Sequence, residues 1–276
     1  MQIKTITCHE VYNHGASLQE YALLSFLNTN GFEAQTIHYK PGYLSNHFNL
    51  FSVSNPKFNK PLIKQLYLLA KLPNRLKDLK RKKAFDVFAE KYIPTDTTKY
   101  ISNQELKENL PVADAYICGS DQIWNSFFQN GKDPAFYLDF VPDDKLKISY
   151  AASFATETIA EDLKPFVKEK VSRINHISVR ETSALKILND LGISNAIQVL
   201  DPIFLLDKEH WMQFVFPIKE AFVFIYDFDS NPTLKKMALE YKSKHNVKIY
   251  TVNQNIDYAD KNFYYEGPET FLSLMQ

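Results

Sequence analysis

The feature that most constrains the fold of this chain is a repeated alternation of strand-like and helix-like patterns. An apolar stretch at Ile3–Cys8 precedes a helical spacing of apolar residues over Ala16–Asn30, which Asn30-Gly31 is expected to end. A second strand pattern follows at Glu33–Tyr39. Chains that alternate in this way build parallel sheets covered by helices. We therefore predict an α/β fold.

The alternation is interrupted once and then returns. Residues 43–110 read as a helical insertion, with helical patterns near Leu62–Leu72 and Leu76–Tyr92. We predict a first domain at 1–216 that contains this insertion, and the start of a second domain at 217–276. The later strand patterns lie at Ala113–Cys118, Lys147–Phe154, His176–Glu181, Ala221–Phe228 and Val247–Val252. A helix pattern lies at Pro232–His245.

The charge balance argues against nucleic acid as a partner. Among 276 residues, Lys+Arg and Asp+Glu number 32 each, so the chain has no global field that would attract a polyanion. The two cysteines, Cys8 and Cys118, lie in apolar runs and are expected to be buried thiols. The N-terminus lacks the apolar core of a signal peptide. We expect a cytoplasmic protein that could work at the inner face of the membrane.

A basic run within the insertion has two interpretations. Arg75–Lys83 reads "RLKDLKRKK", which is typical of a solvated helix face. The same run could instead meet an anionic glycolipid or a membrane surface. Peripheral membrane contact is therefore a second expectation for this segment.

Ligands of open α/β sheets bind beyond the carboxyl ends of the strands, so the loops at those ends are the candidate sites. In the first loop, Tyr12–Gln19, Gly15 permits close backbone approach and the following helix offers N–H groups. No dinucleotide or P-loop motif is present. The loop either binds an anion or a hydroxyl, or it only turns the chain.

Three further loops carry polar groups. Asp121 in "GSDQIWN" could act as a base or hold a sugar hydroxyl, or it could cap a helix. Trp124 could stack on a sugar ring or lie in the core. Arg180 in "SVRE" could clamp a phosphate or carboxylate, or pair with a neighbouring acid. Asp201-Pro202 is expected to cap and turn the chain.

No metal site and no cofactor are expected from the sequence. His14 and His176 do not lie at metal-ligand spacing with other ligands.

Five blocks together resemble one family, the polysaccharide pyruvyl transferases. They are "YNHGASLQEYAL", "VADAYICGSDQIWN", "FYLDFVPDDKLKISYAASFA", "ISVRETSALKILNDLGI" and "VLDPIFLLDKEHW". The resemblance implies a GT-B-like arrangement of two Rossmann-like halves with mainly parallel sheets, of which the second half is incomplete in this chain. It also implies transfer of a pyruvate ketal from phosphoenolpyruvate, the donor substrate, to a sugar of a cell-surface or exopolysaccharide.

The resemblance assigns roles to individual residues. Asn13, Gly15 and Gln19 match the first motif and would face the acceptor, a sugar, oligosaccharide or lipid-linked glycan. Asp121 matches the "GSDQ" motif as an acceptor contact or base. Arg180 would bind the phosphate or carboxylate of the donor. Trp124 is the further acceptor-binding candidate.

The sequence departs from the family at its end. Family members continue past a helix like Pro268–Met275 into a histidine-bearing "S-x-H-G" or "R-x-H-G" loop, and this sequence has no such motif. We therefore expect these 276 residues to be inactive alone and prone to self-association. The alternatives are a non-catalytic glycan-binding or partner-assembled protein on the same scaffold, and a sugar transferase that uses a nucleotide-sugar donor.

Overall fold

The structure is a computed structural model that describes residues 1–45, 48–53, 56–253 and 256–276. The chain divides into two compact units. The first combines Met1–Asn46 with Ala89–Leu206, and the second combines His47–Phe88 with Asp207–Gln276. The division thus falls before residue 216, and much of the segment expected as an insertion in the first domain groups with the second unit.

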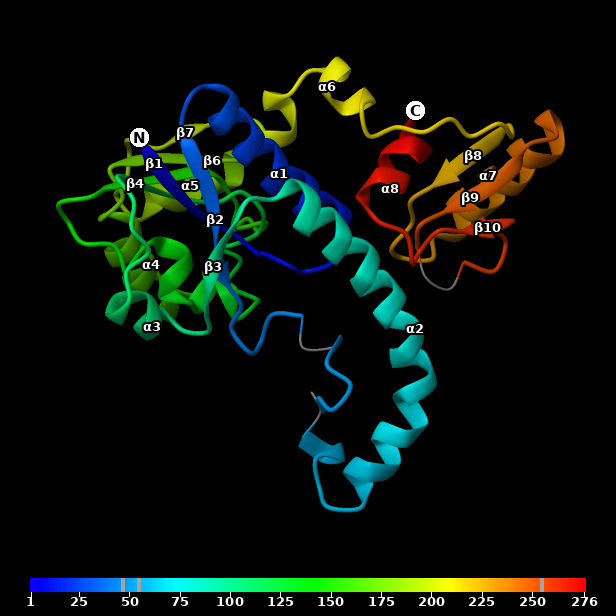
Figure 1. The fold of residues 1–276 in the computed structure, drawn as a ribbon, viewed down its shortest axis with the longest axis horizontal. Coiled ribbons are helices and arrows are strands. Elements are labelled where there is room, and N and C mark those ends of the chain that lie inside the picture. Colours follow the sequence, from blue (N-terminus) through cyan, green and yellow to red (C-terminus); the bar gives the residue numbers. More distant parts are fainter. Residues whose placement is uncertain (46–47, 54–55, 254–255) are drawn as a thin grey trace. The chain divides into compact units, whose positions relative to one another are not determined.

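A parallel sheet forms the centre of the first unit. Within the described residues it has seven strands in the order β3-β2-β1-β4-β5-β6-β7 (Figure 1). This is a Rossmann-like order that reverses between β1 and β4, and the predicted α/β class is confirmed. The strands are β1 (Gln2–Ile6), β2 (Glu33–Tyr39), β3 (Thr95–Tyr100), β4 (Ala115–Cys118), β5 (Leu146–Ala152), β6 (His176–Val179) and β7 (Ile197–Gln198).

The first helix ends where Asn30-Gly31 predicts, but it begins at His14, before the expected Ala16. Asn13 is extended, and its side-chain oxygen accepts a hydrogen bond from the Ala16 N–H at the first turn. Gly31, just past the end, has a φ of +85°, which glycine adopts without strain. The helices of this unit are α1 (His14–Thr29), α3 (Asn103–Glu108), α4 (Lys164–Val171) and α5 (Thr182–Asp190), with short 3₁₀ segments at Asn130–Lys132, Pro134–Tyr137, Glu161–Leu163 and Pro202–Leu205.

The core of the first unit surrounds its central strands. All four residues of β4 are buried, as expected of a strand covered on both faces. Both cysteines are free and buried, as the sequence predicts.

Two elements differ from the sequence-based expectation. The two helical patterns of the insertion form one helix, α2 (Ile63–Tyr92), which continues through Pro73. Strand β3 was not predicted, because its sequence "TDTTKY" is polar. That polarity fits its place at the edge of the sheet, where one side meets solvent.

The second unit has a smaller parallel sheet. Its described strands lie in the order β10-β9-β8. Ile225 packs with Ala238 of α7 on one face, while Phe224 contacts Phe271 of α8 at 5.9 Å between ring centroids. Helices therefore contact both faces of β8. The elements are the 3₁₀ segment Pro56–Phe58, α6 (Lys208–Met212), β8 (Phe222–Ile225), α7 (Pro232–His245), β9 (Lys248–Thr251), β10 (Lys261–Asn262) and α8 (Pro268–Met275).

Among the described residues, we find no helix with the length and hydropathy of a bilayer-spanning segment.

Candidate functional site at the carboxyl edge of the first sheet

A pocket of about 580 Å³ lies at the carboxyl ends of the strands of the first unit. Its walls come from the segments after β1, β2, β4, β6 and β7. It therefore adjoins the point between β1 and β4 where the strand order reverses, which is where open α/β sheets bind ligands. Five of the six predicted site residues line it: Asn13, Gly15, Gln19, Asp121 and Arg180. The predicted common edge of these loops is confirmed.

The first loop presents the start of α1 to the pocket. Gly15 and Ala16 line the wall, and they belong to the first turn of a 16-residue helix. The helix dipole and the N–H groups that the cap does not use make such a turn favourable for an anion. Asn13 serves as the N-cap with its side-chain oxygen, so the loop both turns the chain and faces the pocket.

Gln19 holds two loops together. It is only 2% exposed. Its Nε2 donates to Ala16 O at 2.9 Å and to Thr7 Oγ1 at 3.3 Å, and its Oε1 accepts from the Ser120 N–H at 3.1 Å. Because both ends of the amide are engaged in these bonds, Gln19 fixes the loop after β1 against the loop after β4.

Asp121 is half-buried and has a left-handed backbone with a φ of +61°. Its Oδ1 accepts from the Gln122 N–H at 2.7 Å. Burial raises the pKa of the Asp121 carboxyl, while this hydrogen bond and the charge of Arg180 oppose the rise. Turns and bends follow Asp121, so it does not cap a helix. A carboxyl with a raised pKa is suited to proton transfer.

Arg180 follows β6 and pairs with an acid across the pocket. Its Nη1 donates to Asp201 Oδ2 at 3.0 Å, and its side chain remains 28% exposed. Asp201 also accepts from the Ser120 hydroxyl at 3.4 Å and from the Ile203 N–H at 3.1 Å. The salt-bridge interpretation of Arg180 therefore holds in this structure. A guanidinium carries five N–H donors, so one such bond does not exhaust it.

Trp124 does not line the pocket. It is fully buried, its ring stacks on Tyr137 at 5.4 Å, and its Nε1 donates to Phe136 O at 3.0 Å. A sugar cannot reach a side chain in this position, so the core interpretation is correct and the stacking interpretation is wrong. Phe128, which is 56% exposed, is the aromatic side chain that lines the pocket.

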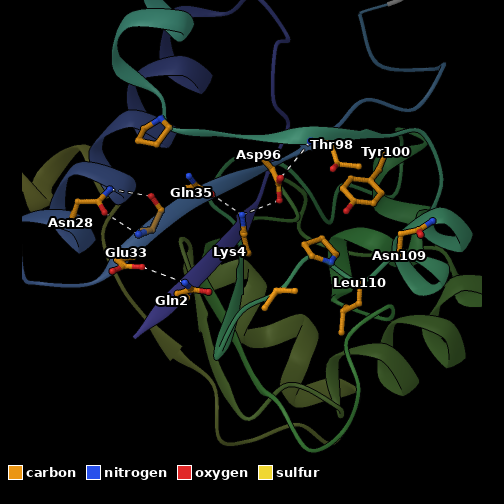
Figure 2. A pocket seen from close by; sticks show the side chains of 14 residues that line it. Gln2, Lys4, Asn28, Glu33, Gln35, Asp96, Thr98, Tyr100, Asn109 and Leu110 are labelled. Atoms are coloured by element: carbon orange, nitrogen blue, oxygen red, sulfur yellow. Dashed lines mark hydrogen bonds and ion pairs between the residues drawn. The ribbon is translucent and has the colours of Figure 1, made fainter.

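A second pocket, of about 1010 Å³, is lined by the first residues of β1 and β2 and extends along β3 to its last residue, Tyr100 (Figure 2). Gln2 and Glu33, which begin β1 and β2, form part of its wall. Its polar groups pair with one another: Lys4 Nζ lies 2.9 Å from Asp96 Oδ2 and 2.7 Å from Gln35 Oε1. This pairing favours the first pocket as the site.

The sequence analysis missed three contributors. Asp201 was expected only to cap and turn, yet it also binds Arg180. Phe128 carried no signal that separated it from core aromatics. His9, which is buried, lies beside Glu10 and His38 in a group that could hold a metal ion. Residues so far apart in sequence meet only through the pairing of β1 with β2.

The fold and the pocket define an α/β protein with a Rossmann-like unit and a site that suits an anionic or sugar ligand. The sequence model of the polysaccharide pyruvyl transferase family matches residues 13–276. The chain belongs to this family. Searches of curated proteins and of solved structures gave no match.

Proposed function

We propose that this protein transfers a pyruvyl group from phosphoenolpyruvate to a sugar, oligosaccharide or lipid-linked glycan of a cell-surface or exopolysaccharide. The observation that carries the proposal is the convergence of Arg180, Asp121 and the first turn of α1 on one pocket. Membership of the family supports the class of reaction. Phosphoenolpyruvate is the donor that the family resemblance implies, and the chemistry of the pocket supports this choice.

Phosphoenolpyruvate carries a carboxylate and a phosphate, and the pocket offers two groups that suit them. The planar fork of Arg180 binds either anion through paired N–H donors. We assign the backbone N–H of Gly15, in the first turn of α1, to the other anion, because the Ala16 N–H already donates to Asn13 Oδ1. The donor competes with Asp201 for the Arg180 guanidinium.

The reaction requires the transfer of two protons. Two sugar hydroxyls add to the enol carbon, which forms two C–O bonds and breaks the bond to the phosphate oxygen. One hydroxyl proton goes to the methylene carbon, which becomes a methyl group, and the other leaves with the phosphate. Asp121 is the group we assign as base for a hydroxyl, because its raised pKa brings it closer to the range of efficient proton transfer.

The acceptor side comprises Asn13 and Phe128, which line the same pocket as Gly15. An exposed aromatic ring provides the apolar surface on which the face of a sugar ring packs. Gln19 acts on the acceptor through its neighbours, because its amide holds the two loops together.

A non-catalytic glycan-binding protein is the second candidate. The observation that favours it is the Arg180–Asp201 ion pair, which neutralises the charge that an anionic donor needs. In that case the pocket binds a glycan and has no affinity for phosphoenolpyruvate.

Titration of the chain by calorimetry separates the two candidates. Phosphoenolpyruvate, inorganic phosphate and pyruvate are titrated separately, and each titration is repeated with a candidate galactoside present. The transferase predicts saturable binding of phosphoenolpyruvate that is tighter than binding of either fragment. Binding of the galactoside without any binding of phosphoenolpyruvate contradicts the transferase and favours the glycan-binding protein.

We also propose peripheral membrane contact through α2. Lys77, Lys80 and Lys83 are exposed and recur at helical spacing, so they share one face. Arg75 and Arg81, by contrast, donate to backbone carbonyls of the second unit. Co-sedimentation with anionic vesicles, but not neutral ones, is expected and should weaken with salt. Equal binding by a variant with all three lysines changed to glutamate contradicts this proposal.

A further inference from the structure

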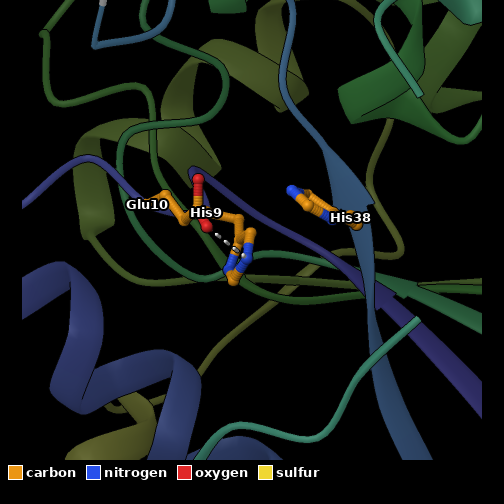
Figure 3. A group of neighbouring side chains, drawn as sticks. All are labelled: His9, Glu10 and His38. Carbon is orange, nitrogen blue, oxygen red and sulfur yellow. Dashed lines mark ion pairs between the residues drawn. The ribbon is translucent and has the colours of Figure 1, made fainter. Parts of the chain in front are cut away.

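A group of potential metal ligands lies beside the pocket, on β2 and just after β1. His9 and Glu10 follow β1, and His38 lies near the end of β2, its parallel neighbour. One ligand atom from each of the three side chains lies within 4.8 Å of the other two. Figure 3 shows the His38 ring extending from its strand toward the other two side chains.

The orientation of His9 is fixed by a buried carboxylate. Its Nδ1 lies 2.9 Å from Glu20 Oε1, and both side chains are 3% exposed. An Nδ1–H that donates to Glu20 leaves the Nε2 lone pair available, and Nε2 lies 3.9 Å from Glu10 Oε1. Metal-ligating histidines almost always have such a carboxylate, carbonyl or water on the second ring nitrogen.

Glu10 has its two oxygens in different surroundings. Oε2 pairs with Lys40, while Oε1 is the oxygen near His9. Lys40 is itself bonded to the Tyr12 hydroxyl at 3.0 Å. Lys40 therefore orients the carboxylate, although its charge also competes with a metal ion for Glu10. Binding of a dication should accordingly be weaker than at a site without the lysine.

From these contacts we propose that His9 Nε2, Glu10 Oε1 and His38 form a site for a borderline divalent metal ion such as Zn²⁺. Two imidazoles and one carboxylate are a donor set that Zn²⁺ and Co²⁺ accept, usually with a water as fourth ligand. Mg²⁺ and Ca²⁺ prefer oxygen donors and should not bind. Metal–nitrogen bonds of about 2.0–2.1 Å require the side chains to close in around the ion.

Metal binding would tie two strands together at the edge of the pocket. Cys8 and Val11, which flank His9 and Glu10 in sequence, line the pocket wall. The ion would therefore stabilise the segment that leads into α1. The inference does not depend on the donor or the acceptor of the proposed reaction.

The test uses the metal-free chain, titrated with Co²⁺ by absorption spectroscopy and with Zn²⁺ against a chromophoric chelator. We expect one equivalent to bind, with the intense visible bands of tetrahedral Co²⁺ and no competition from Mg²⁺ or Ca²⁺. His38→Ala and Glu10→Gln should each weaken binding at least about tenfold, and Glu20→Gln by about 10–100-fold. His176→Ala, which removes an exposed histidine, is the matched control and should change nothing.

Two results would overturn the proposal. One is the absence of saturable binding, or equal affinity in His38→Ala, Glu10→Gln and the parent chain. The other is a thiolate-to-cobalt band that disappears in Cys8→Ser, because that would place the ion on the cysteine. Circular dichroism on each variant establishes that it is folded before affinities are compared, and His38, which is half-buried, is changed in place of buried His9 for the same reason.

Discussion

Arg180 Nη1 and Asp201 Oδ2 lie 3.0 Å apart across the carboxyl edge of the first sheet. The same Asp201 oxygen accepts the Ser120 hydroxyl at 3.4 Å, so the ion pair connects the loops after β4, β6 and β7. The pair also places the Asp201 carboxylate where an anionic group of the proposed donor must bind Arg180. In the proposed function the donor therefore replaces Asp201 as the partner of Arg180, which leads to the first prediction.

Asp201→Asn should strengthen phosphoenolpyruvate binding. The substitution removes a negative charge beside Arg180 and retains an oxygen that can accept the Ile203 N–H. Removal of one like charge near a partly exposed anion site is worth about 1 kcal/mol, or several-fold in affinity. Calorimetric titration at low and high salt measures this gain. Weaker binding in Asp201→Asn would mean that Asp201 holds Arg180 in place and does not compete with the donor.

Asp121→Asn should raise thermal stability near neutral pH. Burial raises the pKa of Asp121 in the folded state, so folding favours its protonated form. Its contribution to stability is full below the unfolded pKa of about 3.9 and is lost as pH rises through the folded value. Asparagine cannot ionise, so the advantage of the variant should be largest near about pH 7 and vanish toward about pH 4.

Thermal unfolding of the parent chain and of Asp121→Asn across this range measures the effect. Asp144→Asn, at an exposed aspartate outside the helices, is the control and should follow the parent. A variant that loses stability near neutral pH would show that the ionised carboxylate is stabilised by its surroundings. The assignment of Asp121 as a base with a raised pKa would then be wrong.

Gly119→Ala should destabilise the first unit severely. A Cβ at this position would lie 2.2 Å from the backbone oxygen of Tyr150, and the φ of +115° disfavours any side chain. Backbone atoms cannot move aside as a flexible side chain can, so we expect a loss of more than about 2 kcal/mol or no folded protein. Gly42→Ala, with nothing within 4 Å and an ordinary φ, is the control for chemical denaturation. Similar midpoints for the two variants would contradict this account of the "CGSD" turn.

The sequence predicts the elements that have strong local signals. Glu33–Tyr39 and Pro232–His245 match β2 and α7. Gly31 precedes β2, and the Asn231-Pro232 cap marks the start of α7. Local signals failed between Leu72 and Leu76, where two helical patterns were expected and α2 continues through Pro73. They also failed at β3, whose polar residues resemble a loop.

The sequence predicts those residues of the candidate site whose place follows from the position of their loops after strands. Parallel strands bring their carboxyl ends to one edge, so Asn13, Asp121 and Arg180 could be placed together from their positions after strands. Trp124 could not, because one turn of backbone decides whether a ring faces the core or the pocket. His9 and His38 meet only through the register of two strands, which spacing in the sequence does not reveal.

The central claim, that Arg180 binds the donor, is tested most directly by calorimetric titration of phosphoenolpyruvate into the parent chain, Arg180→Lys and Arg173→Lys. Arg173 is the matched control, because it has a similar exposure of 30% and pairs with Asp143 outside the pocket. We predict that Arg180→Lys binds at least about tenfold more weakly, because lysine lacks the planar fork, and that Arg173→Lys binds like the parent. Equal affinity in all three proteins would contradict the account and leave Arg180 as a structural partner of Asp201.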